Sequence, residues 1–463
     1  MKTNNHAPPR LVVVSNRGPY RISATSRGIK YERTIGGLVT SLLPMLEQNG
    51  GEWIAWGEPA GRYEIPLRKP RFSLHHLSLT EAQARGFYQG FSNGALWPLC
   101  HCFLGRTRYD LNEWRIYEEV NQLFATAALE DSSETDILWV HDYQLARVPH
   151  VIRQQRPSAK LLFFWHIPFP PVDLFRTIPW RRPLLESLLA CDLIGFHIPG
   201  YARNFAENAV EILGARYEDG TIHYGGRATR VLARPIGIDY AAIDREARSQ
   251  RIEKRVHNLR QALGAGTLIV GVERMDYTKG IVERLRAVEY LLEHQPAWRG
   301  KFSLIQIVTP SRLDVEAYRQ KKREIDETVG RVNGRFSDST WIPIRYLHRS
   351  FSPSELITYY RVADIALVTP LRDGLNLIAK EFAAARIHDD GVIILSEFAG
   401  AAHQLPEALI TNPYGQEEMA ATLEQALKMP ISEQRWRMEA MRNRIKSQDI
   451  KWWANEFLGC LNS

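Results

Sequence analysis

Short, uninterrupted apolar runs recur along the whole chain, and longer stretches with helical spacing of apolar residues separate them. In the first half these runs lie at residues 11–14, 137–140, 161–164 and 193–196, and in the second half at 268–270, 304–308, 365–368 and 392–395. Because the runs do not alternate with polar residues, they predict strands buried on both faces, which is typical of parallel sheets covered by helices. The sequence therefore predicts two doubly wound α/β domains.

Helix signals lie between the predicted strands. Residues 352–355 form a capping box, Ser-Pro-Ser-Glu, with proline at the first helical position. A core-facing stripe with helical spacing is formed by Met419, Leu423, Ala426 and Leu427. The first set of strands ends near residue 236, which predicts an N-terminal domain at 1–236 and a C-terminal domain at 237–440. Residues 441–463, which carry Trp452, Trp453 and Phe457, are expected to form a helix that crosses back to the first domain.

Composition and charge narrow the class of protein. The 463 residues are 44% hydrophobic, enough for two full cores, and 59 Lys and Arg against 52 Asp and Glu give a net charge of +7. The basic residues form no tail or block, so anionic small substrates are favoured over nucleic acid as the partner. Four cysteines in so long a chain indicate a reducing compartment.

The chain shows no targeting or membrane segment. Its polar first ten residues lack the apolar core of a signal peptide, and no run of about 18 uncharged apolar residues predicts a membrane span. We therefore expect a cytoplasmic protein that binds neither membranes nor nucleic acid. The oligomeric state stays open, with a homo-oligomer as one possibility.

The first half contains several candidate binding residues, and some of them directly follow predicted strands, where open α/β sheets bind ligands. A glycine pair that includes Gly37 could let the backbone approach a phosphate, or could serve only a turn. Tyr88 and Trp97 are suited to sugar faces and phosphate oxygens, although core packing would explain them equally well. Asp142 and His166 each come directly after a strand, where a side chain either meets a substrate or caps the next helix.

Charged residues follow the strands of the second half as well. Arg274 and Lys279 could neutralise a diphosphate, or could be ordinary surface cations. Asp373 and Glu381 are eight residues apart, which in a helix is about 12 Å along nearly the same face. A nucleotide sugar could span them, with its hexose at Asp373 and its ribose at Glu381. The alternative makes Asp373 a helix N-cap and Glu381 a solvated residue.

Nine motifs in order carry a family resemblance: SNRGP, GGL, YQGFSNGALWP, WVHDYQL, HIPFP, VERMDYTKG, YLHRS, RDGLNLIAKEF and LSEFAGAA. Together they resemble the retaining trehalose-6-phosphate synthases from about residue 11 to residue 457. The resemblance implies two facing Rossmann-like domains of the GT-B type, with the active site in the cleft between them. It also implies transfer of glucose from a nucleotide diphosphate sugar, with UDP-glucose as the expected donor, to glucose 6-phosphate, giving α,α-trehalose 6-phosphate and a role in osmoprotection.

The same resemblance assigns roles to residues. The acceptor and its phosphate would be held by Arg17, Tyr88, Trp97 and Arg349, with Asp142 against the acceptor sugar. His166 and Asp373 would contact the transferred glucose. The donor would lie along Gly37 and the backbone of Gly374, Leu375, Asn376 and Leu377, with its diphosphate on Arg274 and Lys279 and its ribose on Glu381.

Some alternatives stay open at this point. The second half also resembles glucosylglycerol-phosphate synthases, which use glycerol 3-phosphate, but the SNR and GGL patterns favour glucose 6-phosphate. A non-catalytic nucleotide-sugar sensor of the same fold is a further alternative, and the donor base could be uridine, adenosine or guanosine. Because no Asp-x-Asp run is present, we expect no metal in the site. We also expect no other cofactor. The chain ends soon after the last motif, so we expect no fused phosphatase.

Two routes would retain the anomeric configuration. In front-face attack the departing phosphate takes the acceptor proton, and this route is favoured because the leaving group is already good. A covalent route through Asp142 or Asp373 is the alternative.

Overall fold

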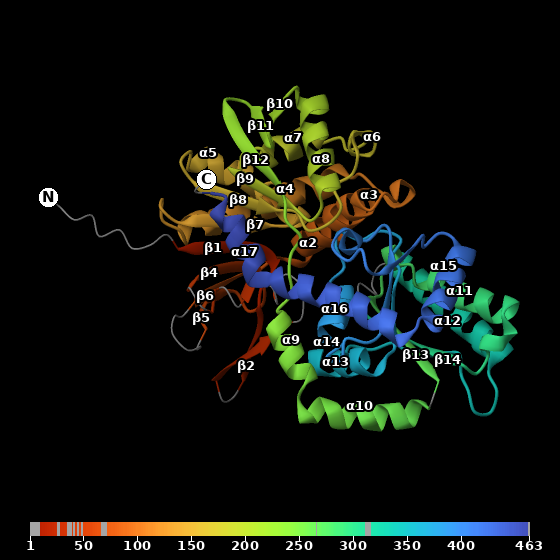
Figure 1. Cartoon of the computed structure of the whole chain (residues 1–463). Helices are drawn as coiled ribbons and strands as arrows, with labels where there is room; N and C mark the ends of the chain where they lie inside the picture. The colour runs from red at the N-terminus through yellow and green to blue at the C-terminus, as the bar shows by residue number, and fades with distance from the viewer. Residues whose placement is uncertain are drawn as a thin grey trace. The chain divides into compact units, whose positions relative to one another are not determined.

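A computed structural model describes residues 10–25, 28–34, 39, 42–43, 46–47, 50–65, 72–264, 266–310 and 316–461. The chain divides into two compact units. Unit 1 comprises the residues up to Ile236 together with those from Lys451 onward, and unit 2 comprises Gly237–Ile450. Each unit is built around its own large sheet (Figure 1).

The sheet of unit 1 has, among the described residues, the strand order β10-β11-β12-β9-β8-β7-β1-β4-β6-β5. The strands from β12 to β6 run parallel, and the ends of the sheet are extended by antiparallel strands, β11 and β10 on one side and β5 on the other. The strands are β1 (Leu11–Arg17), β4 (Gly51–Trp56), β5 (Gly61–Glu64), β6 (Phe72–Leu77), β7 (Ile137–His141), β8 (Lys160–Phe164), β9 (Leu193–Phe196), β10 (Arg216–Glu218), β11 (Thr221–Tyr224) and β12 (Arg227–Ala233). A separate hairpin pairs β2 (Tyr20–Thr25) with β3 (Gly28–Arg33).

Helices alternate with these strands. They are α2 (Glu81–Ala84), α3 (Trp97–Cys100), α4 (Leu111–Glu130), α5 (Val148–Gln155), α6 (Val172–Phe175), α7 (Arg181–Leu188) and α8 (Pro199–Asn208). Helix α4 begins where the Asp110 side chain accepts hydrogen bonds from the backbone N–H groups of Asn112 and Glu113. Between α2 and α3, residues Arg85–Leu96 form a wide helix with i→i+5 geometry, a rare conformation that is frequent at functional sites.

The sheet of unit 2 is entirely parallel in its described part, with the order β15-β14-β13-β16-β17-β18. Its strands are β13 (Thr267–Arg274), β14 (Phe302–Thr309), β15 (Ile344–Leu347), β16 (Ile365–Val368), β17 (Val392–Ser396) and β18 (Leu409–Thr411). Every apolar run singled out in the sequence lies in a strand of the parallel part of one of the two large sheets. The prediction from uninterrupted apolar runs is confirmed for these strands.

The helices of unit 2 are α9 (Tyr240–Ala247), α10 (Gln250–Leu263), α11 (Ile281–His294), α12 (Glu316–Phe336), α13 (Pro353–Val362), α14 (Leu377–Ala385), α15 (Gln416–Lys428) and α16 (Ile431–Ser447). The predicted capping box begins α13, where Ser352 and Glu355 satisfy each other's backbone N–H groups. On α15 the stripe residues Met419, Leu423 and Ala426 are buried, whereas Leu427 is partly exposed. The capping box is confirmed, and the stripe is confirmed except at Leu427.

The chain returns to unit 1 at Lys451, later than residue 441, where the sequence suggested the crossing. Helix α17 (Ile450–Gly459) packs Trp453 and Phe457 on the sheet of unit 1. The Trp139 ring of β7 lies 5.2 Å from Trp453 and 5.1 Å from Phe457, measured between ring centroids. No described helix of either unit is long and apolar enough to cross a membrane.

Candidate active site

In unit 2, a buried ion pair joins the loops that follow two neighbouring strands. After β13 the chain makes a tight turn in which Asp276 Oδ1 accepts a hydrogen bond from the Thr278 N–H. The turn ends at Lys279, which is 6% exposed and whose Nζ lies 2.5 Å from Asp373 Oδ2. The next residue, Gly280, has φ of 63°, and a Cβ there would lie 2.3 Å from the Thr369 carbonyl oxygen. Glycine therefore allows this turn to approach the loop after β16.

Asp373 has further hydrogen-bond partners in its own loop. Asn376 Nδ2 donates to Asp373 Oδ2 at 3.2 Å, and the Leu375 N–H donates to Oδ1 at 3.4 Å. The N-cap of α14 is Asn376, whose Oδ1 accepts from the Ala379 N–H. The sequence-based alternative that made Asp373 the N-cap is therefore wrong. The idea that Asp373 and Glu381 lie on one helix is also wrong, because the helix begins only at Leu377.

The backbone of this loop is strained and held in place. Asn376 has φ of 77° and ψ of 102°, an uncommon conformation for a residue with a side chain, and such residues cluster at functional sites. The Ala401 N–H donates to the Leu375 carbonyl oxygen at 2.7 Å. A Cβ on Gly400 would lie 2.1 Å from the Gly374 carbonyl oxygen, so only glycine fits there. The first turn of α14 follows directly, and its amides have no intrahelical acceptors.

Glu381 lies one turn further along α14 and is half-buried rather than solvated. Its Oε2 accepts a hydrogen bond from the Tyr360 hydroxyl at 3.1 Å. Burial raises the pKa of Glu381 to about 7. The solvated alternative for Glu381 is therefore wrong. Sequence reasoning missed Tyr360, which lies on α13 and is linked to Glu381 only by the fold.

The two predicted arginines of unit 2 are both exposed. Arg274 is the last residue of β13, the strand that leads to Lys279. Arg349 follows β15, and its guanidinium lies 3.7 Å from the centroid of the Phe351 ring and 3.3 Å from Glu355 Oε1. The contacts of Arg349 are thus with the start of α13, and the structure does not join it to the Lys279–Asp373 pair.

A second buried ion pair, Arg284–Glu273, holds the strand ends from which these loops leave. Arg284, which is fully buried on α11, donates to Glu273, to Gln306 and to Thr369, each at 3.1 Å. These bonds tie β13, β14 and the end of β16 to one side chain. Because Lys279 and Asp373 belong to the loops that leave β13 and β16, this network holds the strand ends that position them.

In unit 1, Arg17 and Tyr88 lie together. Arg17 ends β1 and is exposed, and its Nη2 donates to the Tyr88 hydroxyl at 3.2 Å. Tyr88 lies in the wide helix Arg85–Leu96, and its ring packs against Trp56 at 5.9 Å. The structure thus brings together two of the residues that the resemblance assigns to the acceptor.

Trp97 is connected to Tyr88 through Asn93 and Tyr143. Asn93 Nδ2 donates to the Tyr88 carbonyl oxygen at 2.6 Å, and Asn93 Oδ1 accepts from the Tyr143 hydroxyl at 2.9 Å. The rings of Tyr143 and Trp97 lie 5.8 Å apart, and Trp97 is 5% exposed. Gly37 lies outside the described residues.

Asp142 and His166 also meet. Asp142 follows β7 with φ of 73° and ψ of 165°, a region used almost only by glycine. Its Oδ1 accepts from the His166 backbone N–H at 3.1 Å, and it makes no side-chain cap. His141 Nδ1 lies 3.1 Å from His166 Nε2. Burial lowers the pKa of His166 to about 3, so this ring is neutral near pH 7.

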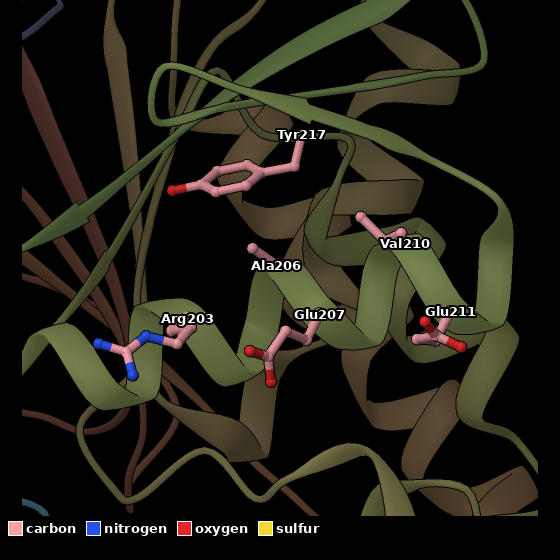
Figure 2. A pocket seen from close by; sticks show the side chains of 6 residues that line it. All are labelled: Arg203, Ala206, Glu207, Val210, Glu211 and Tyr217. Atoms are coloured by element: carbon pink, nitrogen blue, oxygen red, sulfur yellow. The ribbon is translucent and has the colours of Figure 1, made fainter.

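Unit 1 also has a small surface hollow of about 230 Å³ beside α8, under Tyr217 (Figure 2). Its lining is Arg203, Ala206, Glu207, Val210, Glu211 and Tyr217. None of these is a predicted site residue.

Comparison with known proteins places the chain in a family. Residues 9–463 match the sequence model of glycosyltransferase family 20. The chain belongs to glycosyltransferase family 20. A trehalose-6-phosphate synthase of Mycolicibacterium smegmatis is 40% identical over 462 residues, which is 97% of this chain and 92% of the relative.

Two solved structures show a likeness in three dimensions as well. An α,α-trehalose-phosphate synthase (UDP-forming) from Burkholderia xenovorans, in complex with glucose 6-phosphate, has a TM-score of 0.90 and 35% identity over 98% of this chain and 100% of that one. A structure from E. coli bound with UDP-2-fluoro glucose has a TM-score of 0.90 and 35% identity over 98% of each chain. The predicted α/β fold with two parallel-sheet units, which is that of the GT-B type, is confirmed.

Proposed function

We propose that this chain transfers glucose from UDP-glucose to glucose 6-phosphate, giving α,α-trehalose 6-phosphate with retained anomeric configuration. The proposal rests above all on the buried Lys279–Asp373 pair at the head of α14, in a chain that belongs to glycosyltransferase family 20. The relatives named above are trehalose-6-phosphate synthases, and one of their structures holds glucose 6-phosphate. They favour glucose 6-phosphate over glycerol 3-phosphate as the acceptor.

On the donor side, Lys279 and Arg274 bind the diphosphate and Asp373 contacts the glucose. Lys279 supports this role because it is a buried cation beside a helix N-terminus, where an anion is stabilised by both charge and backbone amides. The backbone of Gly374–Leu377, which the Ala401 N–H holds in place, lies along the donor. Glu381 accepts hydrogen bonds from the ribose hydroxyls. Gly37 keeps its expected role beside the donor on the resemblance alone.

On the acceptor side, Arg17 and Tyr88 bind the phosphate of glucose 6-phosphate. Their direct hydrogen bond and the exposure of Arg17 support this assignment. Trp97 and Asp142 contact the acceptor sugar. The strained backbone of Asp142 supports this assignment, because such conformations cluster at functional sites. Arg349 remains a proposed phosphate contact through the resemblance, and its exposed side chain leaves it accessible.

The reaction needs positive charge on the diphosphate as the C–O bond breaks, and Lys279, Arg274 and the α14 amides supply it. The departing phosphate then takes the acceptor proton while the acceptor oxygen bonds to the anomeric carbon from the same face. Asp373 is held by Lys279 and Asn376, and Asp142 accepts from His166. Both carboxylates therefore suit an orienting role better than that of a covalent nucleophile.

The direct test incubates the protein with UDP-, ADP- or GDP-glucose against glucose 6-phosphate or glycerol 3-phosphate, and identifies each product by NMR. We expect α,α-trehalose 6-phosphate, formed fastest from UDP-glucose. A protein that binds UDP-glucose but forms no product would be the nucleotide-sugar sensor, and a glucosylglycerol phosphate product would move the chain to the sister group. Trapping a glycosyl-enzyme at Asp142 or Asp373 would replace the front-face route.

Arg274 provides a check on the assigned chemistry. Loss of one charge-stabilising donor typically costs about 100- to 1000-fold in kcat, so Arg274→Ala should lose most turnover while keeping its fold. The matched control is Arg286→Ala, which removes an exposed arginine from α11 and should leave turnover unchanged. Near-normal turnover of Arg274→Ala would remove Arg274 from the mechanism.

We further propose a cytoplasmic location and a role in osmoprotection, as expected for trehalose synthesis. The supporting observation is that none of the four cysteines, all of them in the described part, forms a disulfide. Salt-dependent retention on DNA that uridine nucleotides fail to displace would instead indicate nucleic-acid binding.

A further inference from the structure

The ring of His141 is a buried polar group to which the proposed reaction gives no part. His141 is the last residue of β7 and is fully buried. In the parallel register it lies opposite Phe164, two residues before His166 on the next strand of the sheet. Its Nδ1 and the Nε2 of His166 are 3.1 Å apart, which is a hydrogen bond between two imidazole rings.

Only one of these two nitrogens can donate, because both rings are neutral. Burial lowers the pKa of His166 to about 3 and the pKa of His141 well below its ordinary value. A neutral imidazole carries one N–H, so the direction of the bond fixes the tautomer of both rings. With His166 Nε2 as the donor, His141 would carry its own proton on Nε2. With His141 Nδ1 as the donor, His141 Nε2 is a bare acceptor and His166 carries its proton on Nδ1.

The surroundings of His141 distinguish these two arrangements. Among the described residues, His141 Nε2 is buried and has no hydrogen-bond partner. The ring of Trp139 packs against His141 with centroids 4.7 Å apart, and its Nε1 is itself a buried donor with no acceptor in the described part of the chain. Buried donors without acceptors are rarer than under-used acceptors. If His141 Nδ1–H is the donor, His141 Nε2 carries no proton. This arrangement therefore avoids a second buried donor without an acceptor beside Trp139 Nε1.

We propose that His141 is a positioning residue that holds His166 in its Nδ1-protonated tautomer, so that this N–H donates to a hydroxyl oxygen of the transferred glucose. The His166 backbone N–H is meanwhile bonded to Asp142 Oδ1, so consecutive residues at the end of β7 fix both the main chain and the ring of His166. The identity of the ligand rests on the proposed function. The tautomer does not rest on that function, because it follows from the burial of the two rings and from their contacts with each other and with Trp139.

The tautomer is tested on the wild-type protein by long-range proton–nitrogen NMR after labelling with ¹⁵N-histidine. The His166 signals are assigned by their absence from His166→Phe. We expect His166 Nδ1 to resonate as a protonated nitrogen and Nε2 as a bare one. The opposite pattern in the folded wild type would overturn the proposal whether or not the protein is active.

The positioning role is tested with two substitutions of His141. In His141→Asn the amide nitrogen takes the place of Nδ1 and can still donate, whereas His141→Leu fills the volume with no donor. Misplacement of a group that contacts substrate can cost about 100-fold in rate, so His141→Leu should lose up to about this much kcat with little change in KM for either substrate. His141→Asn should recover most of the kcat at similar thermal stability.

Each outcome decides between defined alternatives. Equal loss of kcat in both variants, or no loss in His141→Leu, would overturn the positioning role. If His141→Leu fails to fold, the wild-type tautomer and the kcat of His141→Asn still decide the question. A wild-type protein that forms no trehalose 6-phosphate would overturn the proposed function while the tautomer measurement still stands.

Discussion

Lys279 and Asp373 are 94 positions apart in the chain, yet the Lys279 ammonium lies 2.5 Å from an Asp373 carboxylate oxygen. Their side chains are 8% and 15% exposed, so the pair is largely removed from water. Both residues are proposed to contact the same donor molecule, one at the diphosphate and one at the glucose. In the absence of ligand each one therefore neutralises the other.

The first prediction follows from competition for the ammonium group. Because the Asp373 carboxylate competes with a diphosphate for Lys279, Asp373→Asn should bind UDP about 5- to 10-fold more tightly, a gain of roughly 1 kcal/mol. It should turn over much more slowly than the wild type, since its contact to glucose is altered. Isothermal titration calorimetry with UDP measures the first effect. Asp326→Asn, which alters an exposed pair on α12, is the control, and weaker UDP binding by Asp373→Asn would contradict this relationship.

The second prediction concerns stability. Removing one partner of a buried ion pair leaves an uncompensated charge and typically costs about 3–5 kcal/mol, so Lys279→Met should unfold at clearly lower urea concentration. The matched control is Lys322→Met, which breaks the exposed pair with Asp326, where the two side chains are 37% and 42% exposed. Such surface pairs contribute about 1 kcal/mol or less. Similar urea midpoints for the two variants would show that the Lys279–Asp373 pair is screened by solvent.

The third prediction separates the charge of Asp142 from its backbone conformation. Asparagine tolerates positive φ about as well as aspartate and keeps an oxygen for the His166 N–H, so Asp142→Asn should retain thermal stability. Its kcat should fall by about 100-fold or more, as is typical when one preorganised polar group of an active site is lost. Asp219 also has positive φ, 45°, and lies between β10 and β11, so Asp219→Asn is the control. Loss of folding in Asp142→Asn would assign a structural role to this charge.

The fourth prediction is a pH dependence of donor binding. Burial raises the pKa of Glu381 from 4.5 to about 7, and ribose hydroxyls donate more strongly to the ionised carboxylate. The KM for UDP-glucose should therefore fall as the pH rises through about 7. Glu381→Gln should remove this dependence, while Glu417→Gln on the exposed face of α15 should keep it.

The same pKa shift has the opposite consequence for folding. Between pH 4.5 and about 7 the carboxyl group of Glu381 is protonated in the folded chain and ionised in the unfolded one, so the folded state binds more protons. Its contribution to stability is therefore complete below pH 4.5 and is lost as the pH rises through about 7. Glu381→Gln should flatten the pH dependence of the unfolding free energy over this range.

Apolar runs predicted the parallel strands β1, β7, β8, β9, β13, β14, β16 and β17, because such runs are typical where both faces of a strand are buried. They did not single out the parallel strands β4, β6, β15 and β18. The strand group β10–β12, in which β12 pairs in parallel with β9 and antiparallel with β11, was missed for the same reason. Its strands are partly exposed, with buried and exposed positions mixed along β12, so they lack the apolar run used as the signal. The wide helix Arg85–Leu96 was missed because its glycines and polar residues resemble a loop.

The candidate site could be predicted only in part. Residue types after strands indicated Asp142 in unit 1 and Lys279 and Asp373 in unit 2, because the carboxyl ends of the parallel strands lie at one edge of each sheet. Their partners could not be predicted, since Tyr360 reaches Glu381 only through the packing of α13 on α14. The start of α14 was placed too early because Asp373 and Asn376 are both good N-cap residues, and only the loop geometry decides which of them caps the helix.

Helix α17 gives the two units different positions in the order of synthesis. Unit 2 is one continuous segment, whereas unit 1 receives Trp453 and Phe457 only after all of unit 2 has been translated. On the ribosome, unit 2 can therefore complete its core before unit 1 does. Until then the apolar faces of Trp139 and Phe164 in unit 1 stay uncovered. Until α17 has been translated, this apolar surface of unit 1 therefore lacks the side chains that cover it in the folded protein.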